Sequence, residues 1–166
     1  MPIPGIPQPE YISISPTLRL RRYDGVHDFA LDWYRDEETV WLVDGDRKLY
    51  DPELLGRMYA YLNEHGELYF IELADDDSFR PIGDVTFWRE DMPIVIGDKS
   101  MRGRGIGRSV IAALVERGRS LGYESLSVEE IYDWNTASSR CFESLGFIAA
   151  EKTEKGHSYK LDLQNL

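Results

Sequence analysis

The sequence predicts one α+β domain with a mixed sheet, and three observations support that prediction. The chain has 166 residues, which suits a single hydrophobic core. Hydrophobic residues make up 42% of the chain and charged residues 30%, as in ordinary globular domains. Stretches with the alternation of strands are interleaved with stretches at helical spacing, and no repeat or low-complexity linker separates them.

The N-terminal part of the chain divides into an arm and the first elements of the domain. Residues 1–16 are expected to form a flexible arm, because four prolines fall within the first ten positions. The folded domain is then expected to span residues 17–166. Residues 17–21 alternate polar and apolar side chains, which predicts a half-buried strand, and apolar positions at helical spacing follow over 24–41.

Cap and turn residues delimit the elements in the middle of the chain. Asp51 followed by Pro52 is typical of an N-cap and a first helical turn, and Gly66 ends the helix that they begin. Two strands are predicted next, at 68–74 and 82–88, joined by a solvated acidic turn.

The C-terminal half alternates short strands with two helices. A strand over 93–96 leads into a glycine-rich loop, and a long amphipathic helix runs from Ile106 until Gly122 stops it. The remaining elements are predicted as a strand at 126–128, a helix from 135 to 145, and a closing hairpin of 147–150 with 157–163.

Composition excludes several classes of protein. The formal net charge of −11 argues against a general nucleic-acid binder, because phosphate backbones attract basic surfaces. The apolar runs are too short to cross a bilayer and the N-terminus lacks a signal-peptide pattern, so we expect a cytoplasmic protein. The single cysteine, Cys141, rules out an internal disulfide framework, and three scattered histidines leave no metal site.

The distribution of charge is more informative than its total. Residues 51–98 carry 12 acidic and 3 basic residues, a local charge of −9. Residues 99–122 carry one acidic and six basic residues, a local charge of +5. A positive island in an acidic chain predicts a site for a small anion, with acidic walls nearby for a cationic partner. Arg117 and Arg119 have a simpler interpretation, as the exposed end of a helix.

The positive island contains the motif that carries the chemistry. The loop reads Arg102, Gly103, Arg104, Gly105, Ile106, Gly107 and Arg108, and it lies between a predicted strand and a predicted helix. Glycines allow a sharp turn in which successive N–H groups point at one anion, and the helix adds the positive end of its dipole. The arginines supply charge-assisted hydrogen bonds to phosphate oxygens. The loop therefore predicts a pyrophosphate site.

Other glycine-rich loops bind phosphate, and two of them do not fit. A Walker loop requires Lys-Ser or Lys-Thr after its last glycine, where this chain has Arg108. A dinucleotide fingerprint has the spacing Gly-x-Gly-x-x-Gly near the first strand, whereas this loop is Gly-x-Gly-x-Gly past the middle of the chain. A purely structural strand-to-helix turn remains an alternative interpretation.

Two landmarks together resemble the GNAT superfamily of N-acetyltransferases. The family's pyrophosphate motif, Arg/Gln-x-x-Gly-x-Gly/Ala, is matched by Arg102, Gly105 and Gly107. The second landmark begins at Asn135 and ends with Gly146-Phe147, where family members commonly have an asparagine and Gly-Phe. The segment before the loop looks most like the branch that contains ribosomal-protein N-terminal and aminoglycoside 6′-N-acetyltransferases.

The resemblance implies a fold and a donor substrate, acetyl-coenzyme A. The implied fold is the GNAT-like acyl-CoA N-acyltransferase fold, a central mixed, mostly antiparallel sheet with a splayed parallel strand pair, flanked by helices. Pantetheine would thread the gap between the splayed strands and pair with backbone groups around Ile96. Asn135 would hydrogen-bond the pantetheine arm and Ser138 would line the same groove. Asn135 also suits a helix N-cap, and both roles are compatible.

Phe142 departs from the family pattern. Family members usually have a tyrosine here, whose hydroxyl lies near the coenzyme sulfur and is thought to protonate the departing thiolate. Phenylalanine keeps the ring and removes that proton, so the resemblance leaves Phe142 a place in the coenzyme site without a general-acid role.

The reaction also requires a base, because a lysine-like ammonium must lose a proton before it attacks a thioester. Four carboxylates lie near the predicted splayed strands: Asp91, Glu90, Asp84 and Glu72. Asp91 is favoured, because related enzymes place a carboxylate near the start of the same strand. Surface charge in a turn that ends at Pro93 is the simpler alternative.

The sequence as a whole predicts direct acetyl transfer from acetyl-coenzyme A to a primary amine in a ternary complex. The acceptor is expected to be cationic, either a small-molecule amine or a peptide N-terminus. A ping-pong route through Cys141, a non-catalytic acyl-coenzyme A-binding module and a pure protein-interaction domain are the alternatives, and a homodimer is one candidate assembly. Four tryptophans are either core residues or parts of a substrate platform: Trp33, Trp41, Trp88 and Trp134.

Overall fold

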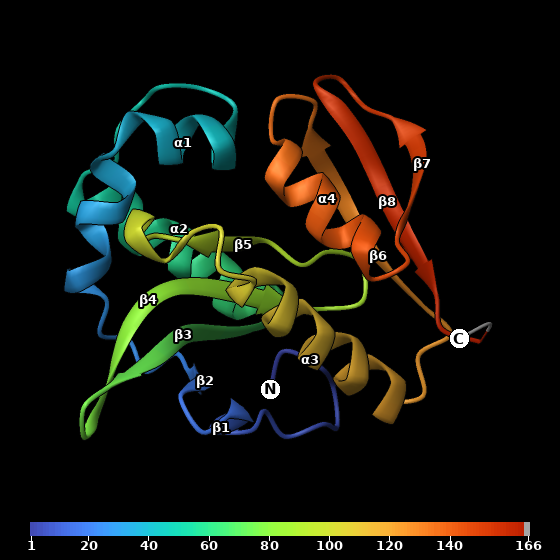
Figure 1. The fold of residues 1–166 in the computed structure, drawn as a ribbon, viewed down its shortest axis with the longest axis horizontal. Helices are drawn as coiled ribbons and strands as arrows, with labels where there is room; N and C mark the ends of the chain where they lie inside the picture. The colour runs from blue at the N-terminus through green and yellow to red at the C-terminus, as the bar shows by residue number, and fades with distance from the viewer. Residues whose placement is uncertain (165–166) are drawn as a thin grey trace.

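The computed structural model describes residues 1–164, which form two antiparallel sheets with helices on their faces (Figure 1). The last two residues of the predicted domain, 165 and 166, lie outside the described residues. The larger sheet has the order β1-β2-β3-β4-β5 and the smaller has the order β6-β8-β7. The strands are β1 (Tyr11–Ser15), β2 (Leu18–Arg22), β3 (Glu67–Asp75), β4 (Ser78–Phe87), β5 (Ile94–Ile96), β6 (Ser125–Tyr132), β7 (Ile148–Lys152) and β8 (Gly156–Asp162).

The helices begin and end largely where the cap residues predict. The helices are α1 (Glu37–Asp44), α2 (Pro52–His65), α3 (Ile106–Ser120) and α4 (Thr136–Ser144), with short 3₁₀ segments at Asp28–Arg35 and Lys99–Met101. The Asp51 side chain accepts from the Leu54 N–H at the start of α2, as the Asp-Pro pair predicts. Gly122, with φ of +80°, follows the end of α3.

The middle of the larger sheet is buried on both faces, with α3 and α2 on opposite sides of it (Figure 1). Along β3, Tyr69 and Ile71 pack into a core shared with α3, α4 and the smaller sheet. Leu68 and Phe70 point the other way, into a second core formed with α1 and α2. This explains why β3 is a continuous apolar run in place of a simple alternation.

Two predictions about the first third of the chain are corrected by the structure. Tyr11–Ser15, assigned to the flexible arm because of the prolines before it, forms β1 and pairs antiparallel with β2. Its own alternation of Ile12 and Ile14 with polar residues is the strand signal, and both isoleucines pack against the core. The single helix suggested over 24–41 is a 3₁₀ helix followed by α1, divided at Asp36, which caps α1.

The strand pairings support the mostly antiparallel part of the predicted fold. Every strand pairing within residues 1–164 is antiparallel, and the two strands expected to form a parallel pair belong to different sheets. β5 and β6 each lie at the edge of their sheet. The turn after β4 touches β6, since the Ser127 N–H donates to the Arg89 carbonyl at 3.0 Å.

Candidate active site

The glycine loop turns sharply and leaves open space in front of the N-terminal end of α3. Gly103 and Gly105 have φ of +75° and +79°, in the left-handed region that favours glycine. A Cβ added to either residue would meet no atom within 4 Å. Gly105 is the N-cap of α3 and no side chain caps the helix, so the N–H groups of the first turn face this space. The arrangement suits an anion.

Arg102 ties the loop to two other elements. Its Nε donates to the Ile96 carbonyl at 2.9 Å, and one terminal nitrogen donates to Thr39 Oγ1 at 2.9 Å. The other terminal nitrogen, Nη1, is buried, has no hydrogen-bond partner, and lies 3.7 Å from the Glu38 carboxylate. Arg102 therefore fixes the loop against β5 and α1, and its Nη1 keeps an unused donor.

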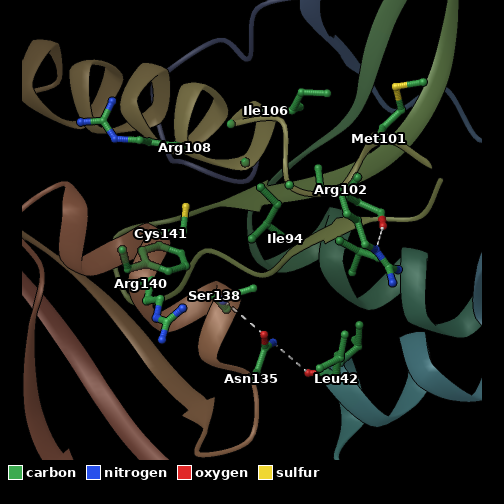
Figure 2. A pocket seen from close by; sticks show the side chains of 18 of the residues that line it. Leu42, Ile94, Met101, Arg102, Ile106, Arg108, Asn135, Ser138, Arg140 and Cys141 are labelled. Carbon is green, nitrogen blue, oxygen red and sulfur yellow. Dashed lines mark hydrogen bonds between the residues drawn. The ribbon is translucent and has the colours of Figure 1, made fainter. Parts of the chain in front are cut away.

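The loop opens onto a cavity of about 460 Å³, called here the loop cavity (Figure 2). Its charged lining residues are all arginines: Arg102, Arg108 and Arg140. Its other lining residues come from α1, β5, the loop and α4: Thr39, Leu42, Val43, Ile94, Val95, Ile96, Met101, Gly103, Gly105, Ile106, Gly107, Asn135, Ala137, Ser138, Cys141 and Phe142.

A second cavity of about 310 Å³, called here the acidic cavity, has the opposite charge. Its charged lining residues are all carboxylates: Asp44, Asp84, Asp91, Glu129 and Glu130. Aromatic and apolar residues complete it: Tyr34, Leu42, Val43, Tyr50, Met58, Leu62, Met92, Pro93, Ile94, Val95, Val128, Ile131, Tyr132, Asn135, Ser138 and Phe142.

The two cavities adjoin, because they share seven lining residues. The shared residues come from α1, β5 and α4: Leu42, Val43, Ile94, Val95, Asn135, Ser138 and Phe142. The acidic cavity is also lined by β6, so the space lies where the edge strands of the two sheets face each other. The two cavities are therefore neighbours on either side of the same set of side chains.

Asp84 is the most buried carboxylate of the acidic cavity. Its Oδ2 accepts hydrogen bonds from the hydroxyls of Tyr34 at 2.7 Å and Tyr59 at 2.8 Å. Burial raises the pKa of Asp84 to about 6, while the two hydroxyls lower it. Asp84 was one of the four candidate carboxylates, but its contacts with the two tyrosines could not be predicted, because the three residues come from the 3₁₀ segment, α2 and β4.

Asp91 lies in the turn before β5 and also lines the acidic cavity. Its Oδ1 accepts from the backbone N–H groups of Met92 at 3.0 Å and Glu129 at 3.1 Å. Burial raises the pKa of Asp91 to about 6, and the nearby Glu129 carboxylate acts in the same direction. The bond to Glu129 links the turn to β6, so Asp91 is held by both sheets.

Asn135 caps α4 with one end of its amide and holds α1 with the other (Figure 2). Its Oδ1 accepts from the Ser138 N–H at 3.2 Å, which is the predicted N-cap bond. Its Nδ2 donates to the Leu42 carbonyl at 3.3 Å, a contact between residues 93 positions apart.

Phe142 and Cys141 have different environments on α4. Phe142 is 1% exposed, packs edge-to-face on Phe147 with ring centroids 5.1 Å apart, and borders both cavities. Cys141 is half-buried and borders only the loop cavity. Burial raises the pKa of the Cys141 thiol, so the thiol form predominates at neutral pH, which disfavours Cys141 as a nucleophile.

Three predicted residues lie away from both cavities. Arg104 is exposed and donates to the Ser100 carbonyl, and it is the residue of the Arg102–Arg108 loop that does not line the loop cavity. Glu72 is buried in ion pairs with Arg19 and Arg21 on the sheet, and Glu90 is exposed in a turn. The four tryptophans do not border either cavity. Trp41 and Trp134 stack on each other, with ring centroids 4.3 Å apart.

With this geometry established, the family follows from a match over most of the chain. Residues 18–147 match the model of the acetyltransferase (GNAT) family. The chain belongs to the GNAT acetyltransferase family. Its members are acetyl-CoA-dependent transferases, which confirms the resemblance drawn from the loop and the Asn135–Phe147 segment. Among curated proteins, none matches the chain significantly.

Solved GNAT structures share the fold at low sequence identity. The aminoglycoside acetyltransferase AAC(6′)-Ib, solved with coenzyme A, is 18% identical with a TM-score of 0.71, covering 89% of this chain and 96% of that one. A spermidine N-acetyltransferase from Vibrio cholerae, solved with coenzyme A and spermine, is 15% identical with a TM-score of 0.72 (90% and 98%). RimL, a ribosomal L7/L12 α-N-protein acetyltransferase, is 19% identical with a TM-score of 0.69 (92% and 98%).

Sequence reasoning missed the part of this GNAT site that α1 supplies. Thr39, Leu42 and Val43 line the loop cavity, and Arg140 adds a third guanidinium from α4. Spacing i, i+3, i+4 on α1 was the available signal, but it also suits simple burial.

Within residues 1–164, no helix is long and apolar enough to span a membrane.

Proposed function

We propose that this GNAT acetyltransferase moves an acetyl group from acetyl-coenzyme A to a primary amine of a cationic acceptor. The observation that carries the proposal is the pair of adjoining cavities, one lined by arginines and the other by carboxylates. A phosphate-rich donor and an ammonium-bearing acceptor would each meet the opposite charge, and their reactive ends would meet at the shared residues.

The donor's pyrophosphate fits the loop and the first turn of α3. Gly103, Gly105 and Gly107 would let the backbone approach it, and Arg108 would contribute charge together with Arg102, whose Nη1 makes no hydrogen bond. Ile106 would line the same end of the groove. Arg104 would take part only through the charge it adds to the mouth of the site.

The pantetheine arm fits the open edge of β5. Thr86 donates to the Pro93 carbonyl at 3.0 Å, and antiparallel pairs alternate, so Ile94 and Ile96 direct their backbone groups away from β4. The Ile96 carbonyl is already used by Arg102, which leaves the backbone groups of Ile94 and the Ile96 N–H for amide groups of the donor. Ser138 and the facing edge of β6 would form the other side of the gap.

The acceptor fits the acidic cavity, with Asp91 as the proposed general base. The bound thioester supplies an acetyl group open to attack by a neutral amine. Asp91 would take a proton from the ammonium. Its raised pKa is nearer to the pKa of an amine than the pKa of an ordinary carboxylate is, which favours this proton transfer. Attack would be direct, in a ternary complex, because the cavities adjoin and Cys141 remains a thiol.

Phe142 would border the sulfur without donating a proton to it. Its buried ring contacts both cavities and its position has no hydroxyl. A thiol of pKa near 8.5 leaves readily as a thiolate, so protonation by water or by the new ammonium would suffice.

Coenzyme binding is tested by two glycines that share one helix and one backbone conformation. Gly105→Asp at the start of α3 should reduce acetyl-coenzyme A affinity by at least about 100-fold, because a carboxylate would face the pyrophosphate. Gly122→Asp just after α3 is the matched control, since φ is +79° and +80° at the two sites and both have open space. If calorimetry gives the two variants equal affinity for acetyl-coenzyme A, the glycine loop is not the binding site of its pyrophosphate.

The acceptor is identified by a thiol-release screen across aminoglycosides, polyamines, amino acids and peptide N-termini. Turnover with cationic amines supports the proposal. Tight coenzyme binding without thiol release from any amine would indicate a non-catalytic acyl-coenzyme A-binding module.

A further inference from the structure

The helix α1 covers both cavities and is held there by contacts on its two sides. Leu42 and Val43 line both cavities, and Thr39 lines the loop cavity. On one side, Arg102 bonds to Thr39 and Lys99 pairs with Asp36 at 2.8 Å. These contacts come from the glycine loop and the short segment before it.

On the other side, α1 is joined to the turn between β6 and α4 by a stack of aromatic rings. Tyr132 stacks on Trp134 with centroids 4.9 Å apart, and Trp134 stacks on Trp41 at 4.3 Å. Arg47 extends the stack, with its guanidinium 4.9 Å from the Trp41 ring. Figure 1 shows α1 beside this turn, which precedes α4.

Hydrogen bonds accompany the stack. The indole N–H of Trp134 donates to the Trp41 carbonyl at 3.1 Å, and Asn135 donates to the next carbonyl along α1, that of Leu42 (Figure 2). Both carbonyls belong to the last turn of α1, where helical donors run out. The Trp41 carbonyl also accepts from the Gly45 N–H at 3.2 Å, the last helical bond of α1, and the Leu42 carbonyl lies beyond that bond. The turn before α4 therefore acts as a C-terminal cap for α1, supplied from another part of the chain.

Gly45 shows how closely the end of α1 approaches the rings. It ends α1 with φ of +69°, and a Cβ added there would lie 3.0 Å from the Tyr132 ring and 3.3 Å from the Trp134 ring. Lys155 also donates to the Gly45 carbonyl at 3.4 Å.

We propose that Trp134 is a positioning residue for acetyl transfer. It acts by holding α1 in the place where this helix forms part of the wall of both cavities. Trp134 borders neither cavity itself, so its effect passes through α1. Asn135 shares this role, because its amide already serves α4 and α1. The link to catalysis rests on the proposed function, whereas the link to α1 does not.

The test compares Trp134→Ala with Trp134→Phe, which keeps a ring and loses the indole N–H. Hydrogen exchange of the α1 amides in the free protein should accelerate about tenfold in Trp134→Ala and less in Trp134→Phe, while α3 stays unchanged. The kcat/KM for the acceptor should fall in the same order, by about tenfold for Trp134→Ala. The reason is that a smaller fraction of the protein has α1 packed against both cavities.

Two further variants keep the result interpretable. Gly45→Ala strains the left-handed backbone at the end of α1 and brings a Cβ to 3.0 Å from the Tyr132 ring, so it should change exchange and kcat/KM in the same direction. Tyr61→Ala removes an exposed aromatic side chain that stacks on His65 of α2 and lines neither cavity, and it should change neither measurement.

Unchanged α1 exchange in Trp134→Ala would overturn the proposal. So would faster exchange accompanied by wild-type kcat/KM and wild-type coenzyme affinity. If the wild-type protein acetylates no amine, coenzyme affinity replaces kcat/KM as the functional measurement, so failure of the proposed function is recognised separately.

Discussion

At the scale of single residues, the acidic cavity contains two buried carboxylates, Asp84 and Asp91, whose hydrogen-bond partners differ. Asp84 is enclosed by two tyrosine hydroxyls, whereas Asp91 is bonded by backbone N–H groups in a turn. Burial raises the pKa of each to about 6. Equal pKa values do not distinguish a base from a binding residue, and the geometry favours Asp91, whose carboxylate joins the turn before β5 to β6.

Asp91 as the base predicts a specific pH profile. The base must be unprotonated, so kcat/KM for the acceptor should decline as pH falls through about 6. Asp91→Asn should lower kcat/KM by about 10²–10⁴-fold and abolish that decline. Asp84→Asn is the control and should keep the decline. If the decline disappears in Asp84→Asn and persists in Asp91→Asn, the roles are reversed.

Asp84 predicts a dependence of stability on pH. A native pKa of about 6 against 3.8 in the unfolded chain means that the native state holds the proton more tightly. The contribution of Asp84 to the free energy of unfolding is therefore fully favourable below pH 3.8 and is lost as pH rises through about 6.

Asn at position 84 cannot ionise, so the Asp84→Asn protein should be more stable than wild type by about 3 kcal/mol at pH 8. The gain should be smaller by about 1 kcal/mol at pH 5. Urea unfolding at the two pH values measures it, and a gain that does not vary with pH would contradict the raised pKa.

At the scale of elements, the prediction succeeded where the signal is local. The Asp51 cap, the glycine loop and the Asn135 cap are each specified by neighbours in sequence, and each lies where it was expected. Tyr11–Ser15 was missed because prolines on both sides outweighed its alternation. The placement of α1 could not be read from the sequence, because the contacts that hold it join residues 93 positions apart.

The correction at β1 carries its own prediction. Removing residues 1–15 would uncover the edge of β2 and the apolar contacts of Ile12 and Ile14. It would also remove the bond from the Gln8 side chain to the Leu68 carbonyl at 3.0 Å.

The truncated protein should therefore unfold at a Tm at least about 5 °C lower, since a few kcal/mol of burial is lost. Removing residues 1–5 alone is the comparison and should cost much less. A truncation of 1–15 with wild-type Tm would restore the interpretation of this segment as a flexible arm.

At the scale of the whole molecule, charge is sorted between the two cavities. The acidic run over residues 51–98 predicted a cationic partner, yet the acidic cavity also draws on Asp44, Glu129 and Glu130, outside that run. Much of the run lies elsewhere, as in the exposed turn of Asp76 and Asp77. The sum of charges along the chain therefore predicts the sign of the proposed acceptor, and the fold selects which carboxylates line the acidic cavity.

This sorting predicts that salt weakens acceptor binding through particular residues. The Debye length falls from about 30 Å at 0.01 M ionic strength to about 8 Å at 0.15 M, so KM for a cationic acceptor should rise over that range. Replacing Glu129 and Glu130 together by Gln should raise KM at low salt and flatten its salt dependence, because two carboxylates that line the cavity are neutralised. Replacing Asp76 and Asp77 by Asn removes the same formal charge from the β3–β4 turn, away from both cavities, and should leave the salt dependence as in wild type. Asn is also compatible with the φ of +57° at position 76. If the two double variants change KM equally, acceptor attraction depends on net charge alone and the cavity carboxylates have no special part in it.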